Sequence, residues 1–325
     1  MIQGGMGDRL QCPQLGKAAM AISTILIAVA MQDGDERIAA RAVQLANQHG
    51  AQLVAVHVIE DFPNDDGHLP ASLDAAALAR MIAKQRTGHL ETLLNAAKVP
   101  PSLIVEAGKP HAVIERLAAT YKADLLVIGP GIAKNLRERV FGSTADRVIR
   151  SAPCPILVVR STSPAPYRHI AIGVDFSEYA KAAARHAAHL VPDASRELLH
   201  TVEIPLGFEQ AMLKAGTPQA EIEHYRKAKV RAARTELIQL YGDAGRLPKG
   251  TRIKVQYGDA AAALLRASWQ RGTDLIAVGT QGANAVSQHL LGSVARKVLS
   301  GARCDVLVIP ASALCRRDES AALDE

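Results

Sequence analysis

The chain contains a long internal repeat, which constrains its fold more than any other feature of the sequence. Residues 124–129 (DLLVIG) match residues 274–279 (DLIAVG) at an offset of 150 residues, and Gly142-Ser143 matches Gly292-Ser293 at the same offset. Near the start of each copy the offset is 145, so the second copy carries about five extra residues between its first and third strands. A repeat of this length is a duplicated domain rather than one unit of a solenoid.

The length of 325 residues agrees with two domains of ordinary size. Residues 161–166 are polar and rich in proline, so they can neither continue a strand nor begin a core helix. We therefore predict a first domain over 20–162 and a second over 167–312. Residues 1–19 form an extension without a counterpart in the second copy, and 313–325 form a charged tail.

Each copy alternates short β-branched apolar runs with alanine-rich helical segments. The predicted strands of the first copy lie near 25–30, 53–59, 102–106, 124–129 and 155–160. Those of the second lie near 169–174, 198–203, 252–256, 274–279 and 305–310, with helices at 178–190, 220–241, 259–271 and 290–300. This alternation predicts an α/β fold with a parallel sheet covered on both faces. Ligands of such sheets bind beyond the carboxyl ends of the strands, where the strand order reverses.

A glycine motif follows the fourth strand of the second copy. Gly279 ends the apolar run, Gly282 comes three residues later, and Gly292-Ser293 opens the last helix. Glycine lets backbone N–H groups approach a phosphate, and a helix start supplies unpaired donors at the positive end of a dipole. The pattern contains neither the Gly-Lys-Ser/Thr ending of the P-loop nor the compact glycine triplet of dinucleotide-binding folds.

The spacing Gly-x2-Gly-x9-Gly-Ser resembles the ATP-binding motif of the universal stress protein family. The resemblance covers roughly residues 22–160 and 167–310. It implies a doubly wound five-stranded sheet in each copy, with strand order 3-2-1-4-5 and the reversal between strands one and four. It also implies an adenine nucleotide as ligand, namely ATP with or without Mg²⁺, or AMP or another adenylate.

The resemblance also assigns site residues in the second copy. It places Asp175 at the nucleoside end of the ligand and the backbone of Thr201 and Val202 beside the adenine. The residues it places beside the phosphates are Gly279, Gly282, Gly292, Ser293 and Val294. A purely structural interpretation is also open, in which Ser177 caps a helix and Asp175 forms a turn. His200, in an apolar strand, is interpreted as a core residue.

The first copy departs from this pattern. Ala30 stands where the second copy has Asp175, and Ile132 replaces the second glycine of the spacing. A β-branched residue disfavours a positive φ angle and would crowd a phosphate. The residues of the motif that remain in the first copy are Gly129, Gly142, Ser143 and Thr144, and Gly131, one residue before Ile132, is a candidate to replace the missing glycine through a different turn. We expect nucleotide in the second copy and a weak, altered or empty site in the first.

Three functions remain open from the sequence. The first is a stress-response or signalling module whose surface changes when ATP binds. The second is a slow ATPase, with His289 as the candidate base in the motif loop. The third is an assembly scaffold with a vestigial site, in which Ile156–Val159 and Val306–Ile309 pair within the chain as a pseudo-dimer, with a homodimer of such chains also possible.

Composition argues against several other classes of protein. The net charge of +6 is spread through a sequence with only 3% aromatic residues, which disfavours single-strand nucleic-acid binding. No apolar run is long enough to span a membrane. The four cysteines lack a metal-ligand spacing and imply no disulfide framework, and Cys154 and Cys304 occupy equivalent repeat positions. We therefore expect no metal site, packing roles for this pair and a cytoplasmic location.

Overall fold

The fold is known from a computed structural model that describes residues 21–60, 75–131, 142–162, 164–242, 245–270, 272–282 and 291–314. The elements of the first copy are β1 (Thr24–Val29), α1 (Asp35–His49), β2 (Gln52–Ile59), α2 (Ala75–Leu93), β3 (Ser102–Ala107), α3 (Pro110–Thr120), β4 (Leu125–Ile128), α4 (Ser143–Ser151) and β5 (Ile156–Val158). Those of the second copy are β6 (His169–Gly173), α5 (Glu178–Leu190), β7 (Ser195–Val202), α6 (Leu206–Lys214), α7 (Gln219–Tyr241), β8 (Thr251–Tyr257), α8 (Ala260–Trp269), β9 (Leu275–Gly279), α9 (Ser293–Gly301) and β10 (Asp305–Ile309).

All of these strands belong to one open sheet with the order β3-β2-β1-β4-β5-β10-β9-β6-β7-β8. Each half is parallel and has the order 3-2-1-4-5, which confirms the predicted fold class. The reversal of strand order falls between β1 and β4 in the first half and between β6 and β9 in the second.

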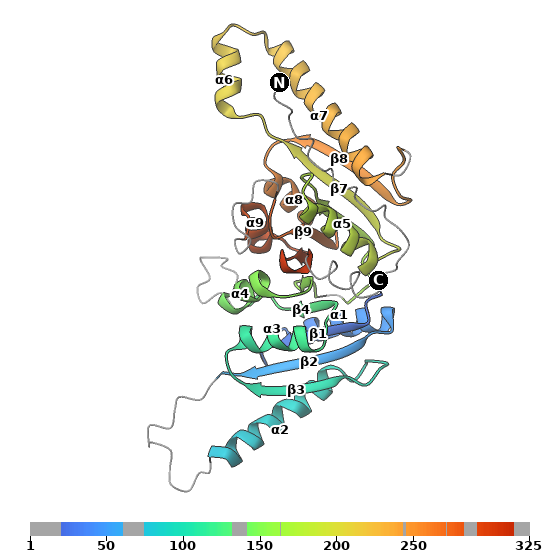
Figure 1. The fold of residues 1–325 in the computed structure, drawn as a ribbon, viewed down its shortest axis with the longest axis vertical. Helices are drawn as coiled ribbons and strands as arrows, with labels where there is room; N and C mark the ends of the chain where they lie inside the picture. Colours follow the sequence, from blue (N-terminus) through green and yellow to red (C-terminus); the bar gives the residue numbers. More distant parts are fainter. Residues whose placement is uncertain are drawn as a thin grey trace, which may run out of the picture.

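The two halves join through their last strands. β5 and β10 pair antiparallel, with Leu157 opposite Leu307 at the centre of the register. The sheet therefore continues along the long axis of the molecule, with α2 near one end and α6 and α7 at the other (Figure 1). Pairing removes two exposed strand edges, each of which would otherwise present unsatisfied N–H and C=O groups.

Both faces of the sheet carry a hydrophobic layer, and each layer draws residues from both copies. Ile25 and Ile27 of β1 enter one layer while Leu26 enters the other, because successive side chains of a strand point to opposite faces. The first layer continues to Leu307 of β10 and the second to Val306 and other residues of the second copy. The two copies therefore share their cores across the β5–β10 junction.

A buried ionic cluster lies at this junction. Asp305, fully buried at the start of β10, accepts hydrogen bonds from the backbone N–H groups of Arg160 and Ser161 at 2.7 Å each. Its other oxygen, Oδ2, accepts from the Tyr167 hydroxyl at 2.5 Å and lies 3.3 Å from Nε of Arg41 on α1. The Arg41 guanidinium also stacks over the Tyr167 ring at 4.0 Å. The carboxylate thus connects α1 of the first copy with residues 160–167 between β5 and β6, here called the linker, and with β10 of the second copy.

The phenol and thiol groups near this cluster stay protonated. Burial, followed by the charge of Asp305, raises the pKa of Tyr167 well above its usual value, so the hydroxyl remains a donor. The same two causes raise the pKa of the Cys304 thiol to about 12. Cys154 and Cys304 are both buried and not in disulfides, as their predicted packing roles require.

The extra length of the second copy lies in one connection. β6 begins 145 residues after β1, β7 begins 143 residues after β2, and β8 ends 150 residues after β3. Between its first two strands, the first copy is therefore two residues longer than the second. Between its second and third strands, the second copy is seven residues longer than the first. The helix α6, which lies in this longer connection, was not predicted, because it is short and weakly amphipathic.

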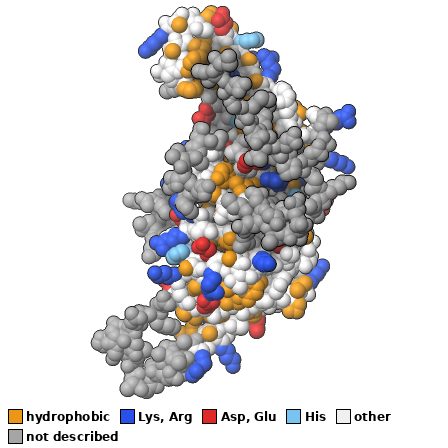
Figure 2. Space-filling model, viewed as in Figure 1, with side chains coloured by type: hydrophobic (Ala, Val, Ile, Leu, Met, Phe, Trp, Pro, Cys, Tyr) orange, Lys and Arg blue, Asp and Glu red, His pale blue; other side chains and the backbone are white. Residues whose placement is uncertain are grey.

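Charged side chains on the face shown in Figure 2 are interspersed rather than gathered by sign. Within the part of the chain that the structure covers, no helix is both long enough and apolar enough to cross a bilayer.

Candidate functional site

The predicted site residues of the second copy lie at one edge of the sheet. β6 lies between β7 and β9, and its last partners are Leu199 on β7 and Ala277 on β9. Thr201 and Val202 extend β7 beyond those partners, and Gly279 ends β9. Asp175 follows β6 directly at the same edge, where the strand order reverses.

Asp175 organises the turn between β6 and α5. Its Oδ1 accepts hydrogen bonds from the Ser177 hydroxyl at 2.5 Å and the Ser177 N–H at 3.2 Å. The Ser177 hydroxyl in turn accepts from the Ala180 N–H at 3.2 Å as the N-cap of α5. Phe176 between them has a φ of 67°, an uncommon conformation for an aromatic residue. The structural interpretation of Asp175 and Ser177 is therefore correct, while the ligand role of Asp175 stays a prediction.

Gly282 lies against the Asp175 carboxylate. A Cβ atom on residue 282 would lie 2.5 Å from Asp175 Oδ2, so every larger side chain must displace either the carboxylate or the loop. Gly282 itself does not adopt a positive φ. The conformational argument for glycine at this position was therefore wrong, and the requirement is one of space.

The other glycines of the motif have packing roles of their own. A Cβ on Gly279 would lie 2.6 Å from the Cβ of Tyr179 on α5, so glycine here lets the helix approach the strand. The N–H of Gly292 donates to the Thr280 carbonyl at 2.7 Å, which closes the loop before α9 begins at Ser293. Val294 is the second residue of this helix.

His289, the candidate base of the motif loop, lies in 283–290, outside the residues that the structure describes.

The first copy closes its loop in another way. The Gly142 N–H donates to the Pro130 carbonyl at 3.3 Å, the counterpart of the Gly292 bond. Gly131 has a φ of 75°, and a Cβ on it would lie 2.9 Å from the Cα of Gly142. These two glycines therefore touch each other, and Gly129 packs against Ile38, whose Cδ1 would lie 2.7 Å from an added Cβ. Ser143 and Thr144 begin α4, and Ile132 lies outside the described residues.

Two histidines occupy equivalent positions in the two copies, although the sequence repeat did not reveal them. Nδ1 of His200 lies 2.8 Å from the Val174 carbonyl, and Nδ1 of His57 lies 3.0 Å from the Val29 carbonyl, in the same place in each copy. The partly buried His200 ring also meets Phe176 edge to face, with ring centroids 4.8 Å apart, and Phe176 packs against the first apolar layer. Aligning the second strands at an offset of 143 rather than 145 would have revealed the pair.

His57 should make stability depend on pH. Burial lowers its pKa below the usual 6.5, against the raising effect of the Val29 carbonyl; Arg86 and His89 lower it further and Asp35 raises it. Below pH 6.5 the unfolded chain binds a proton that the folded chain does not, so stability falls as pH falls from there to the lower folded pKa. The expected slope is up to about 1.4 kcal/mol per pH unit. Urea unfolding at pH 7 and pH 5 should show a smaller pH-dependent loss in His57→Gln than in the parent, and equal losses would contradict this role.

Comparison with known proteins agrees with the architecture. The model of the universal stress protein family matches residues 21–160 and again residues 166–310. A universal stress protein of Thermus aquaticus is 31% identical over 137 residues, which cover 42% of this chain and 98% of that protein.

Two solved structures share the fold over most of this chain. A Pseudomonas aeruginosa protein described as functionally unknown has a TM-score of 0.58 at 18% identity, covering 95% of this chain and 100% of its own. A universal stress protein from Archaeoglobus fulgidus has a TM-score of 0.61 at 16% identity, covering 88% of this chain and 96% of its own. With a double family match, a duplicated strand order and a repeated loop closure, the chain belongs to the universal stress protein family and contains two copies of its domain in tandem.

Proposed function

We propose that the second copy binds an adenine nucleotide, ATP foremost, and that the first copy does not bind it with comparable affinity. The observation that carries the proposal is the approach of Gly282 to Asp175, which brings the glycine loop and a carboxylate together at the switch point of the sheet. Glycine at such an edge admits a ligand close to the backbone.

The charges of the site suggest how a nucleotide would lie in it. A phosphate is repelled by the Asp175 carboxylate, so the phosphates belong near Gly292 and the first turn of α9, where Ser293 and Val294 supply helix N-terminal N–H groups. The carboxylate suits the hydroxyl donors of the nucleoside instead. Thr201 and Val202, beyond the last partner of β7 on β6, would border the base.

The first copy lacks two of these elements. Ala30 offers no side-chain acceptor at the position of Asp175, and Gly131 packs against Gly142 in the first copy, whereas Gly282 packs against Asp175 in the second. These differences support an asymmetric protein with one nucleotide per chain.

The function that fits these features is a cytoplasmic stress-response or signalling module. Nucleotide occupancy would change the surface that the loop between Gly282 and Gly292 offers to a partner. In this proposal the chain acts as an intrachain pseudo-dimer, which the pairing of β5 with β10 supports.

Two measurements test the proposal. Mass spectrometry of the ligand released from denatured purified protein should identify an adenine nucleotide. Calorimetric titration of nucleotide-free protein with ATP should give one site per chain, with GTP binding more weakly. Two equal sites, or no heat and no ATP-dependent increase in melting temperature, would overturn the assignment, because a ligand that binds the folded state must raise its stability.

A further inference from the structure

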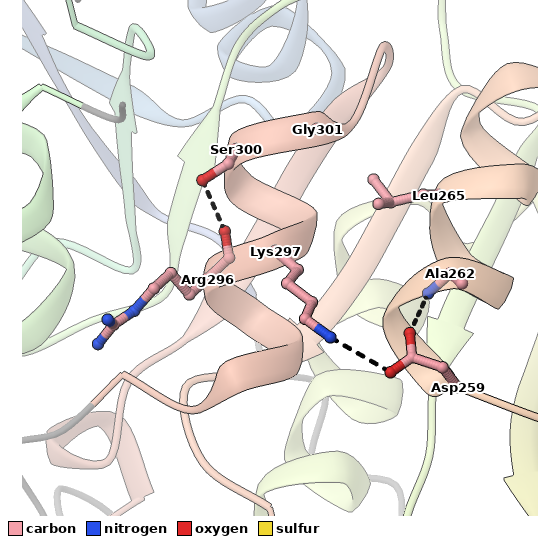
Figure 3. A pocket seen from close by; sticks show the side chains of 7 residues that line it. All are labelled: Asp259, Ala262, Leu265, Arg296, Lys297, Ser300 and Gly301. Atoms are coloured by element: carbon pink, nitrogen blue, oxygen red, sulfur yellow. Dashed lines mark hydrogen bonds and ion pairs between the residues drawn. The ribbon is translucent and has the colours of Figure 1, made fainter. Parts of the chain in front are cut away.

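A groove between α8 and α9 carries features that the nucleotide site does not use. It is an open cavity of about 550 Å³, lined by Asp259, Ala262, Leu265, Arg296, Lys297, Ser300 and Gly301. Figure 3 shows Leu265 reaching from α8 toward α9, with Lys297 crossing the other end of the groove to Asp259. The surface of the groove is almost wholly apolar although it is open to solvent.

The floor of the groove depends on a glycine. A Cβ on Gly301 would lie 3.0 Å from Cδ2 of Leu265, so the absence of a side chain at 301 lets Leu265 pack against the backbone of α9. Leu265 is nevertheless only partly buried. A partly exposed leucine in a groove between two helices suits contact with an apolar side chain of a partner.

An exposed aromatic residue extends the groove beyond Leu265. Trp269, the sole tryptophan of the chain, follows Leu265 by one turn of α8 and is 52% exposed. The guanidinium of Arg303 lies 5.5 Å from the centroid of its ring. Tryptophan and arginine are the residues most enriched among the energetic centres of protein interfaces.

The charge around the groove is positive. Arg296 and Lys297 line it, Arg303 lies over the ring of Trp269, and Asp259 is the only carboxylate among the lining residues. Lys297 pairs with Asp259 at 3.3 Å, but both side chains are about half exposed, so the pair can rearrange at little cost. Within the described residues, neither of the two arginines forms an ion pair with a carboxylate.

The first copy provides a natural contrast. At the positions 150 residues earlier, Glu115 replaces Leu265 and Ala119 replaces Trp269. A carboxylate thus stands where the apolar floor would be, and a methyl group where the indole would be. The same helix pair therefore has the chemistry of a peptide groove only in the second copy.

We propose that the α8–α9 groove is a docking site for an acidic peptide segment of a partner protein that carries an apolar anchor residue. The anchor would lie on Leu265 and beside Trp269, and its acidic neighbours would pair with Lys297 and Arg303. Charge complementarity favours this occupant over a basic or uncharged peptide, because like charges brought together at an interface are repelled.

The tryptophan supplies a direct readout. The probe is a synthetic dodecapeptide of Glu, Ala and Leu, titrated into the full chain while the fluorescence of Trp269 is followed. The expected result is a saturable change that is absent with a peptide in which alanine replaces every leucine, and absent with one in which lysine replaces every glutamate. The titration contains no nucleotide, so its outcome is independent of the nucleotide assignment.

Matched substitutions locate the site. Lys297→Glu should weaken binding about tenfold and Leu265→Glu, which installs the residue of the first copy, by at least as much. Arg147→Glu, the equivalent change in the first copy, should alter the affinity less than about twofold. Circular dichroism verifies that each variant is folded, and Lys297 is exposed, so at least that variant tests binding rather than folding.

Several outcomes would overturn the proposal. One is a tryptophan signal that does not change with the leucine-containing peptide. Another is equal binding by the peptide without leucine, or equal loss from Arg147→Glu and Lys297→Glu, since either would indicate general charge attraction. A single-stranded oligonucleotide that saturates the Trp269 signal while the peptide does not would assign the groove to a nucleic acid instead.

Discussion

Asp305→Asn should lower the free energy of unfolding by about 3–5 kcal/mol, the cost typical of breaking a buried ion pair by removing one partner. The asparagine keeps an oxygen for the two backbone donors of the linker, at Arg160 and Ser161. It removes the charge, however, and leaves the guanidinium of Arg41 buried at 3% exposure without its counterion. Urea unfolding followed by circular dichroism measures the loss, provided that the free energy of unfolding depends equally steeply on urea concentration in the two proteins.

A surface pair of similar geometry is the control. Asp146 and Arg150 are one turn apart on α4, joined at 2.9 Å, and both are partly exposed. Asp146→Asn should therefore cost less than about 1 kcal/mol. A loss of that size for Asp305→Asn would contradict the structural role of the cluster.

A double substitution separates charge burial from packing. Arg41→Met combined with Asp305→Leu removes both charges and fills a similar volume, so it should be more stable than Asp305→Asn alone. If the double variant is the less stable of the two, the hydrogen bonds to the linker and to Tyr167 matter more than the ion pair.

The second large effect concerns the nucleotide site and depends on the proposed function. Gly282→Ile should weaken ATP binding by roughly 5- to 150-fold, because overpacking of this kind costs about 1–3 kcal/mol. The physical reason is the 2.5 Å that separates a Cβ at this position from Asp175 Oδ2. Calorimetry with ATP measures the change, and the melting temperature without nucleotide shows whether the fold is intact.

Asp175→Ala tests the same contact from the other side. It removes an acceptor for the nucleoside and should weaken ATP binding by itself. It also removes the carboxylate oxygen with which the isoleucine of Gly282→Ile would clash. The double variant should therefore lose less binding free energy than the sum of the two single losses. Additive losses would show that the two residues act separately.

A serine pair provides the control between the two copies. Ser293→Ala changes the first residue of α9 and should weaken ATP binding, whereas Ser143→Ala at the start of α4 should leave it unchanged. Loss of binding from Ser143→Ala alone would place the working site in the first copy and contradict the asymmetric assignment.

Local sequence signals were sufficient to predict the repeat and the order of the helices and strands along the chain. The strands are short apolar runs rich in β-branched residues, and several end at or near glycine or proline, so their ends differ from the predicted ones by at most three residues. The N-cap role of Ser177 was also predictable, because a cap involves residues only three positions apart in the sequence. The strand order was predicted from the resemblance to the family, and that resemblance rested on the spacing of the glycine motif.

The geometry of the glycine motif was only partly predictable. The sequence placed Gly282 and Asp175 at one edge of the sheet, and the structure brings them into contact. It could not show that the reason for glycine is space beside a carboxylate rather than a positive φ, because that reason depends on a residue more than a hundred positions away. The reason for glycine at 279 is equally distant in the sequence, because Gly279 at the end of β9 packs against Tyr179 on α5.

The sequence by itself determined that this chain is a duplicated α/β domain with one complete and one altered glycine motif, because hydrophobic periodicity, glycine spacing and repetition are all written along the chain. Only the tertiary structure decided how the copies are joined. Asp305, Arg41 and Tyr167 share no local pattern, and they meet because β5 and β10 pair antiparallel and bring α1, the linker and β10 together. A buried carboxylate needs partners on every side, and those partners exist only after the two halves of the sheet have joined.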